Sequence, residues 1–226
     1  MSTEFNAHID HLTRELLALK LWHAGAVRAS MTAPFKLASG NFSPVYFNCR
    51  RVISNPAFMQ FFTAATMQIV GNCGIECHAV AGGETAGIPF AAYVAQALGL
   101  PMMFVRKAAK GHGIGSLVEG GDPTGKTVLL VEDLITDAGS KKHFIDALRA
   151  VGGEVRDVLV LFDRQQGGAE TLAGIGIKLH SVTDLTAALN VARNYRLLSE
   201  SELVSISAYL NNPKVWHQER GLQFLE

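Results

Sequence analysis

The pattern of hydrophobic and polar positions predicts the first elements of the chain. In the first two dozen positions, hydrophobic residues recur at steps of three and four: Phe5, Ile9, Leu12, Leu16 and Leu19. This spacing predicts an amphipathic helix with that row on its packed face. The following stretch, FKLASGNFSPVYFNCRRVISNP, alternates and is rich in Gly, Ser, Pro and aromatic residues, so we expect short strands and turns there. A second helix is predicted over Ala57–Val70.

From residue 77 onward a unit repeats, in which an apolar run is followed by a glycine-containing turn and a helix. The apolar runs are Cys77–Ala81, Met102–Val105, Thr127–Val131, Val155–Phe162 and Ile177–Val182. Helices are expected at Ala86–Leu98 and Lys141–Ala150, and in much of the segment from Thr186. Such alternation predicts an α/β fold with a parallel sheet covered by helices. Ligands of such sheets bind beyond the carboxyl ends of the strands, and we expect the site there.

Composition narrows the class of protein. A length of 226 residues with 48% hydrophobic residues suits one domain over residues 1–226, because no Pro/Ser-rich linker divides the chain. Lys plus Arg and Asp plus Glu both number 20 without long runs of like charge, which argues against nucleic acid or an anionic membrane as the main partner.

The location of the protein can also be predicted from its sequence. The first residues are neither a secretory signal nor an Arg-rich transit peptide, and the apolar stretch around Ile88–Leu100 is too interrupted to span a membrane. The three cysteines, Cys49, Cys73 and Cys77, are too few for a disulfide scaffold, so we expect them to be reduced. These features predict a cytoplasmic protein.

The most informative stretch is TVLLVEDLITDAGSKKHFIDALRA. It predicts a buried strand, Thr127–Val131, which is ended by Glu132 and Asp133 and followed by a helix from Lys141. The ITDAGS turn between them offers backbone N–H groups, the Thr136 and Ser140 hydroxyls and the positive end of the helix dipole. These are the components of a phosphomonoester pocket, although the turn lacks the Gly and Lys of a Walker loop.

The acidic pair before this turn is the second candidate feature. No charge of opposite sign follows Glu132 and Asp133 within the next seven residues, so we expect neither carboxylate to have a local salt-bridge partner. Two such carboxylates suit ribose hydroxyls or a divalent metal. The alternatives are a pair that merely ends the strand, and a helix N-cap formed by Asp137.

The segment VLLVEDLITDAGS resembles the phosphoribosyl pyrophosphate signature of the type I phosphoribosyltransferases. The resemblance implies a mostly parallel twisted sheet flanked by helices, with a small N-terminal hood at about residues 30–55. It implies that Glu132 and Asp133 meet the ribose, and that a phosphate loop holds the 5′-phosphate: Thr136, Asp137, Ala138, Gly139 and Ser140. Ala138 stands where the family commonly has Gly, and a positive φ there would cost about 1 kcal/mol.

The stretch FKLASGNFSPVYFNCRR resembles the Ser-Gly-x-x-Ser-Pro element of the orotate-specific branch of this family. The resemblance implies that Tyr46 and Phe47 line the base pocket, and the alternative for both is ordinary core packing. Many members have Lys where this chain has Ala38. Lys36, two residues earlier and on the same face of a strand, is either its substitute or a surface lysine.

The stretch FVRKAAKGHGIGSLVEG resembles the mobile catalytic loop of the same branch. It carries four potential cations, Arg106, Lys107, Lys110 and His112, among glycines that would let the loop move. The resemblance implies that Lys110 and His112 stabilise the departing pyrophosphate, with Arg106 and Lys107 as substrate contacts. The alternative is a solvated basic turn.

Two further segments complete the resemblance. In LVLFDRQQGGAETL, Arg164 corresponds to the arginine that meets the orotate carboxylate, and the alternative is a strand-end ion pair with Asp163. In AVAGGETAGIPFAAYVA, many members carry a Lys close to the position of Ala86. This chain has no Lys there, so Thr85 is implied as the pyrophosphate contact.

The resemblance implies a pentosyltransferase of pyrimidine (UMP) biosynthesis that joins orotate to the ribosyl group of phosphoribosyl pyrophosphate. It further implies Mg²⁺ held mainly through pyrophosphate, with Asp133 as the one candidate protein ligand, and a homodimer with shared active sites. The alternatives are a phosphoribosyltransferase for another base, and a non-catalytic sensor of phosphoribosyl pyrophosphate, which would need a nucleic-acid-binding module and a basic face.

Overall fold

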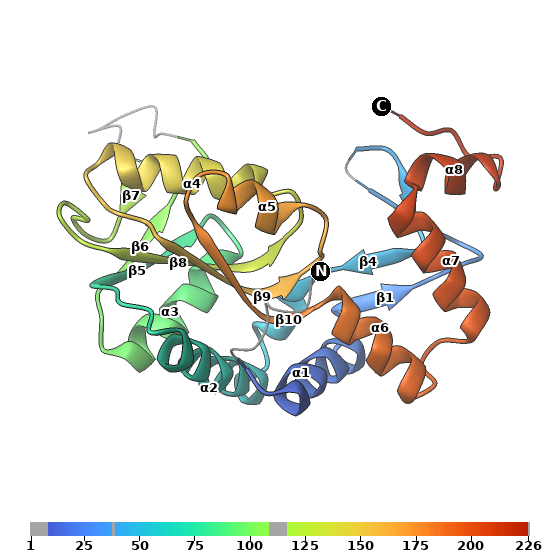
Figure 1. The fold of residues 1–226 in the computed structure, drawn as a ribbon, viewed down its shortest axis with the longest axis horizontal. Helices are drawn as coiled ribbons and strands as arrows, with labels where there is room; N and C mark the ends of the chain where they lie inside the picture. Colours follow the sequence, from blue (N-terminus) through green and yellow to red (C-terminus); the bar gives the residue numbers. More distant parts are fainter. Residues whose placement is uncertain (1–8, 38, 109–116, 226) are drawn as a thin grey trace.

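The computed structural model describes residues 9–37, 39–108 and 117–225, and its centre is a six-stranded sheet (Figure 1). The strands are β5 (Ala79–Gly83), β6 (Met102–Val105), β7 (Val118–Glu119), β8 (Val128–Ile135), β9 (Asp157–Asp163) and β10 (Lys178–Asp184). Their spatial order is β10-β9-β8-β5-β6-β7, and all neighbours are parallel except the pair β6 and β7. The predicted α/β fold with a mostly parallel sheet is confirmed.

Helices cover both faces of this sheet (Figure 1). One face carries α1 (His11–His23), α2 (Pro56–Cys73) and α3 (Gly87–Leu98), and the other carries α4 (Gly139–Ala150) and α5 (Gly168–Ala173). The alternation of β8 explains this arrangement, because Leu129 and Val131 belong to one buried cluster and Val128 and Leu130 to the other. Both faces of a parallel sheet are thereby buried.

The remaining elements lie beside one end of the sheet (Figure 1). Near the start of the chain, β1 (Val27–Ala29) pairs with β4 (Val45–Phe47), and β2 (Phe35–Lys36) pairs with β3 (Phe42–Ser43), both antiparallel. A short 3-10 helix, η1 (Cys49–Val52), follows β4. The helices α6 (Leu185–Asn194), α7 (Glu200–Asn211) and α8 (Pro213–Gln218) confirm the helical prediction for the last forty residues.

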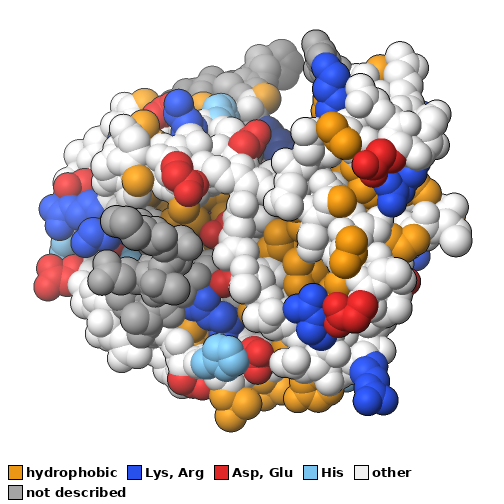
Figure 2. Space-filling model, turned by 45° about the vertical axis from the view of Figure 1, so that its right-hand side comes forward, with side chains coloured by type: hydrophobic (Ala, Val, Ile, Leu, Met, Phe, Trp, Pro, Cys, Tyr) orange, Lys and Arg blue, Asp and Glu red, His pale blue; other side chains and the backbone are white. Residues whose placement is uncertain are grey.

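Charged and hydrophobic side chains are interspersed on the face that carries these C-terminal helices (Figure 2). This distribution agrees with the equal numbers of basic and acidic residues, 20 of each. Among the described residues, no helix combines the length and hydrophobicity that crossing a membrane requires.

Several predicted elements differ from the structure. The first concerns α1, which buries Leu17, Ala18 and Leu21, whereas Leu12 is 74% exposed and Leu16 39% exposed. The helix packs against α6 and β10, and its buried residues follow the predicted ones by one or two positions. The predicted packed face is therefore wrong for Leu12 and Leu16. Phe5 lies outside the described residues.

The second difference concerns β8, which does not end at the acidic pair but continues to Ile135. Glu132 pairs in register with Val160 of β9, so the backbone of the acidic segment remains part of the ladder. The carboxylate of Glu132 can occupy this buried strand position because the charge of Lys141 compensates it. The helix α4 also begins earlier than predicted, at Gly139.

Candidate active site

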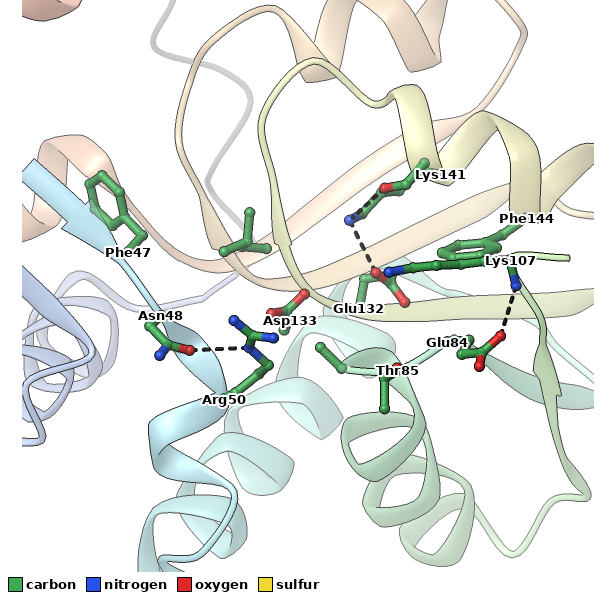
Figure 3. Close-up of a pocket in the computed structure, with 13 residues that line it drawn as sticks. Phe47, Asn48, Arg50, Glu84, Thr85, Lys107, Glu132, Asp133, Lys141 and Phe144 are labelled. Atoms are coloured by element: carbon green, nitrogen blue, oxygen red, sulfur yellow. Dashed lines mark hydrogen bonds and ion pairs between the residues drawn. The ribbon is translucent and has the colours of Figure 1, made fainter. Parts of the chain in front are cut away.

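A cavity of about 270 Å³ opens where β5 and β8 end and α3 and α4 begin (Figure 3). This is the carboxyl edge of the parallel sheet, where the strand order predicts a ligand site. Four parts of the chain contribute to its wall: the segment after β4, the β5–α3 turn, the end of β6, and the β8–α4 segment.

The phosphate loop connects β8 to α4. Ala138 has φ 70°, which is the left-handed conformation expected where the family commonly has Gly. Oδ1 of Asp137 accepts a hydrogen bond from the backbone N–H of Gly139 at 3.0 Å, which stabilises the turn before the helix. The N-cap residue of α4 is Ala138, so the alternative prediction of an N-cap at Asp137 is wrong. Ser140 lies in the first turn of α4 and lines the cavity. The loop therefore presents a helix N-terminus and a hydroxyl to the cavity.

Glu132 is buried and has charged and polar partners. Its Oε2 lies 3.0 Å from Nζ of Lys141, and its Oε1 accepts a hydrogen bond from the backbone N–H of Gly83 at 2.8 Å. The expectation that the acidic pair has no local salt-bridge partner is therefore wrong for Glu132, because the first turn of α4 brings Lys141 back over β8. Burial raises the pKa of the Glu132 carboxyl above its ordinary value, and the charge of Lys141 opposes this rise.

Asp133 lines the same cavity and is mostly buried. Burial raises the pKa of its carboxyl above the ordinary value, while the charges of Lys141 and Arg50 act in the opposite direction. Arg50 is a cavity residue that the sequence-based predictions missed. The only signal for it is a pair of arginines, Arg50 and Arg51, directly after an aromatic stretch, and that pattern is equally typical of a solvated turn.

Arg164 follows β9 and is not among the residues that line the cavity, but it lies beside Phe47, which does line it, and beside Thr136. Its Cζ is 5.0 Å from the centre of the Phe47 ring, and its Nη1 donates to the Thr136 hydroxyl at 3.4 Å. Its Nε is buried and has no hydrogen-bond partner among the described residues. Asp163, the alternative ion-pair partner, instead accepts the backbone N–H of Gln165 at 2.8 Å. Burial lowers the pKa of Arg164 from its ordinary value, since an arginine without a compensating anion is costly to bury.

The two aromatic residues predicted for the base pocket face different surroundings. Phe47 lines the cavity and contacts Phe162, with 4.9 Å between the ring centres. Tyr46 is not among the cavity-lining residues and lies 5.5 Å from the ring of Phe35, because successive residues of β4 point to opposite faces. Lys36 is exposed on β2.

Of the residues predicted to contact pyrophosphate, some line the cavity and others do not. Thr85 and Lys107 line the cavity, and the backbone N–H of Lys107 donates to Oε2 of Glu84 at 2.9 Å (Figure 3). Arg106 is not among the lining residues, and its Nη1 lies 3.1 Å from Oε1 of Glu119. Lys110, His112 and Ala38 lie outside the described residues.

Metal binding by protein groups alone is not supported by this part of the chain. No cluster of three or more His, Cys, Asp or Glu residues that could hold a metal occurs among the described residues. The cavity nevertheless contains the carboxylates of Glu84, Glu132 and Asp133. Mg²⁺ is commonly bound through one or two carboxylates together with substrate phosphates, and these residues fit that mode.

The fold and site define a class of protein. The family model of the phosphoribosyl transferase domain matches residues 51–175, which include the acidic pair, the phosphate loop and Arg164. The chain is 45% identical over 223 residues to an orotate phosphoribosyltransferase of Sinorhizobium fredii, and the match covers 96% of this chain and 95% of that protein. The chain therefore belongs to the orotate phosphoribosyltransferase family.

Solved structures agree with this assignment. The structure of orotate phosphoribosyltransferase from Aeropyrum pernix is similar with a TM-score of 0.70 and 34% identity, and covers 81% of this chain and 99% of that one. The structure of UMP synthase from Leishmania donovani is similar with a TM-score of 0.76 and 26% identity over 87% of this chain. The present chain spans 42% of that longer chain.

Proposed function

We propose that the protein transfers the 5-phosphoribosyl group of phosphoribosyl pyrophosphate to N1 of orotate in the cytoplasm. The products are orotidine 5′-monophosphate and pyrophosphate, and the reaction belongs to the biosynthesis of pyrimidine nucleotides. The observation that carries this proposal is the environment of Arg164, a half-buried cation beside the phosphate loop for which the described residues supply no ion-pair partner.

A carboxylate ligand fits the surroundings of Arg164. A guanidinium binds a carboxylate through parallel hydrogen bonds, and the buried Nε of Arg164 is a donor that such a ligand would use. The ring of Phe47, 5.0 Å from Cζ of Arg164, offers an apolar wall to a flat pyrimidine. Orotate has both the carboxylate and the flat ring, whereas uracil lacks the carboxylate.

The groups that line the cavity, and the phosphate loop next to it, suit phosphoribosyl pyrophosphate. The phosphate loop, Thr136 to Ser140, offers N–H groups and hydroxyls to the 5′-phosphate. Asp133 faces the ribosyl group, where a carboxylate stabilises the positive charge that develops when the C1–O bond breaks. Thr85 and Lys107 lie on the pyrophosphate side, and we propose that Lys110 and His112 close over the leaving group.

Mg²⁺ would fit this site together with the pyrophosphate of the substrate, because carboxylates line the cavity. We propose that the phosphates of the substrate would hold most of the coordination of Mg²⁺. Asp133 is the candidate protein ligand. When bound, the ion neutralises charge on the leaving pyrophosphate.

The chain's own residues act by positioning and charge stabilisation. Arg164 and Phe47 orient orotate so that N1 faces C1 of the ribose, and the phosphate loop fixes the opposite end of the sugar. No covalent enzyme intermediate is needed, so no nucleophilic side chain is assigned. We also propose a homodimer in which the basic segment RKAAKGHG of one subunit reaches the phosphate loop of the other.

The test is loss of orotate absorbance when the protein is mixed with Mg²⁺, orotate and phosphoribosyl pyrophosphate. Uracil and hypoxanthine are run in parallel, and their products are followed by chromatography. Of the three bases, we expect only orotate to be converted. Turnover with a base that lacks a carboxylate, in the absence of turnover with orotate, would refute the proposed role of Arg164.

A further inference from the structure

The turn after β9, residues 163–165, carries Arg164 and has an unusual backbone at the next residue, Gln165. The backbone N–H of Arg164 donates to the carbonyl oxygen of Ile135 at 3.0 Å, which extends the contact between β9 and β8. Gln165 then has φ 54°, a left-handed conformation that residues other than Gly rarely adopt. Its backbone N–H donates to Oδ1 of Asp163 at 2.8 Å. Such a conformation persists only where surrounding contacts hold it.

The side chain of Gln165 supplies a contact between this turn and a distant part of the chain. Its Oε1 accepts two hydrogen bonds from Thr186, one from the backbone N–H at 3.0 Å and one from the hydroxyl at 2.7 Å. A backbone N–H can only donate, so the amide oxygen of Gln165 faces Thr186. Thr186 is the second residue of α6, the helix that directly follows β10 (Figure 1).

These bonds complete the N-terminus of α6. The first N–H groups of a helix have no partner within the helix. The carboxylate of Asp184, the N-cap residue, accepts the N–H of Ala187 at 2.8 Å, and Gln165 accepts the N–H of Thr186. The turn after β9 and the start of α6 therefore stabilise each other.

The guanidinium of Arg164 is weakly held by other side chains. Its Nε is buried without a partner among the described residues, and among the same residues its one side-chain hydrogen bond is to the Thr136 hydroxyl, at 3.4 Å. The ring of Phe47 covers one side of the guanidinium. The direction of the guanidinium is thus set mainly by the backbone that carries it, and a shift of that backbone by about 1 Å would weaken a directional contact with a ligand.

We propose that Gln165 is a positioning residue for orotate: its bonds to Thr186 hold the turn after β9 so that the guanidinium of Arg164 faces the base. This inference rests on the proposed function, in which Arg164 binds the orotate carboxylate. Gln165 is exposed and does not line the cavity, so it acts through its neighbour. The phosphate loop has separate support from Asp137 and α4, and phosphoribosyl pyrophosphate therefore depends on Gln165 much less.

The test uses variants that remove one partner of this contact at a time. Gln165→Met keeps an unbranched side chain of similar length without the acceptor, and Thr186→Val keeps the shape of threonine without the hydroxyl. Thr186→Ser retains the hydroxyl. Gln166→Met is the matched control, because the side chain of Gln166, the next residue, forms no hydrogen bond with the described residues. For each variant, kcat, KM for both substrates and the melting temperature are measured.

For Gln165→Met, we expect KM for orotate to rise about tenfold, because small misplacements of a binding group are costly. KM for phosphoribosyl pyrophosphate should change less than about twofold. The melting temperature should fall by less than about 4 °C, since the lost bonds are exposed. Thr186→Val keeps the backbone N–H and should raise KM for orotate only about threefold, while Thr186→Ser and Gln166→Met should match the wild type.

A second comparison asks whether Gln165 acts through Arg164. Arg164→Ala, Gln165→Met and the double variant that combines them form a double-mutant cycle. If Gln165 only positions the guanidinium, Gln165→Met should have no further effect on KM for orotate once the guanidinium is gone. A general weakening of the fold would instead add to the effect of Arg164→Ala.

Three outcomes would overturn the inference. Wild-type KM values for Gln165→Met would show that the turn keeps its geometry without this side chain. Equal increases in KM for both substrates would make the contact a general stabilising one, and additive effects in the cycle would show that Gln165 does not act through Arg164. If the wild type converted no orotate, the proposed function would fail and this inference with it, a result distinct from conversion of orotate with any of these three patterns.

Discussion

The backbone N–H of Phe42 donates a hydrogen bond to Nε2 of His217, 3.0 Å away, and joins the hood to α8. Nδ1 of His217 lies 2.6 Å from the carbonyl oxygen of Pro213, which can only accept, so Nδ1 carries the proton and the ring is neutral. The side chain of His217 is fully buried. Nearby, Asn41 exchanges two hydrogen bonds with the backbone of Leu225, at 2.7 and 2.8 Å. The C-terminal segment is therefore part of the framework of the hood.

Replacement of this histidine should weaken both the fold and the hood. His217→Ala removes two hydrogen bonds and leaves a buried void, so the free energy of unfolding should fall by about 2–4 kcal/mol. For a chain of this size the melting temperature should fall by about 10 °C. KM for orotate should rise more than KM for phosphoribosyl pyrophosphate, because Phe47, the proposed wall of the base pocket, belongs to the hood. His23→Ala, at an exposed position of α1, is the control, and an equal effect of both variants would contradict this role.

Arg164→Ala should weaken orotate far more than phosphoribosyl pyrophosphate. The change removes the proposed charged contact, which only the base would make, and losses of about 2–4 kcal/mol are usual for such contacts. KM for orotate should therefore rise about 30-fold or more, while KM for phosphoribosyl pyrophosphate stays within about threefold. Steady-state kinetics with each substrate varied in turn measure both values. Equal losses for both substrates would indicate misfolding or a different role.

Ala138→Gly should stabilise the protein. At φ 70° the methyl group of Ala138 is strained, and glycine removes that strain at a smaller entropic cost. The net gain should be about 0.5–1 kcal/mol, which raises the melting temperature by about 2–4 °C. Ala147→Gly is the matched control inside α4, where the same change should destabilise by about 1 kcal/mol. Calorimetric melting of both variants checks the opposite signs, and a lower melting temperature for Ala138→Gly would contradict the strain.

The thiol of Cys49 should resist alkylation in the folded protein. Its burial, and secondarily the charge of Asp133, raise its pKa well above the ordinary value, so very little thiolate exists at pH 8. Cys73 and Cys77 are only partly buried, and burial raises the pKa of each thiol less. Treatment with N-ethylmaleimide followed by mass spectrometry should label Cys73 and Cys77 first, and Cys49 only in urea. Equal labelling rates in the native protein would show that η1 opens readily.

Shared active sites can be tested by mixing inactive subunits. Lys110→Ala and Asp133→Asn proteins, each nearly inactive alone, should form mixed dimers in which one site has both wild-type elements. Random mixing gives about half mixed dimers with one intact site in each, so about a quarter of the wild-type activity should return. A monomer on sizing, or no recovery despite proven subunit exchange, would place the loop over its own chain's pocket.

The parts of the fold that sequence predicted well are those with strong local patterns. The strand at Met102–Val105 was predicted at its observed bounds, because a short apolar run there is closed by charged residues on one side and proline on the other. The left-handed conformation of Ala138 was suggested only by the family resemblance, because Gly is common at this position of the loop.

The features that sequence could not give depend on contacts between distant residues. Nothing in the order of residues shows that Lys141 turns back onto Glu132 or that Gly83 donates to it, because these contacts arise only when β5, β8 and α4 pack together. The packed face of α1 was likewise decided by α6 and β10, which come far later in the chain. Arg50 lies in η1, which follows β4 in the chain. It reaches the cavity because the end of β4, at Phe47, lies in the cavity wall.

The close approach of Gly83 and Gly87 to Glu132 limits how this site can be redesigned for other bases or sugars. A randomised library at either glycine would consist mostly of chains whose sheet edge has been forced apart, whatever base they were meant to accept. Thr85 and Ala86 lie between these glycines and line the cavity without filling that space. Diversity introduced at residues 85 and 86 would reshape this wall of the cavity, the proposed pyrophosphate side, and keep the scaffold intact.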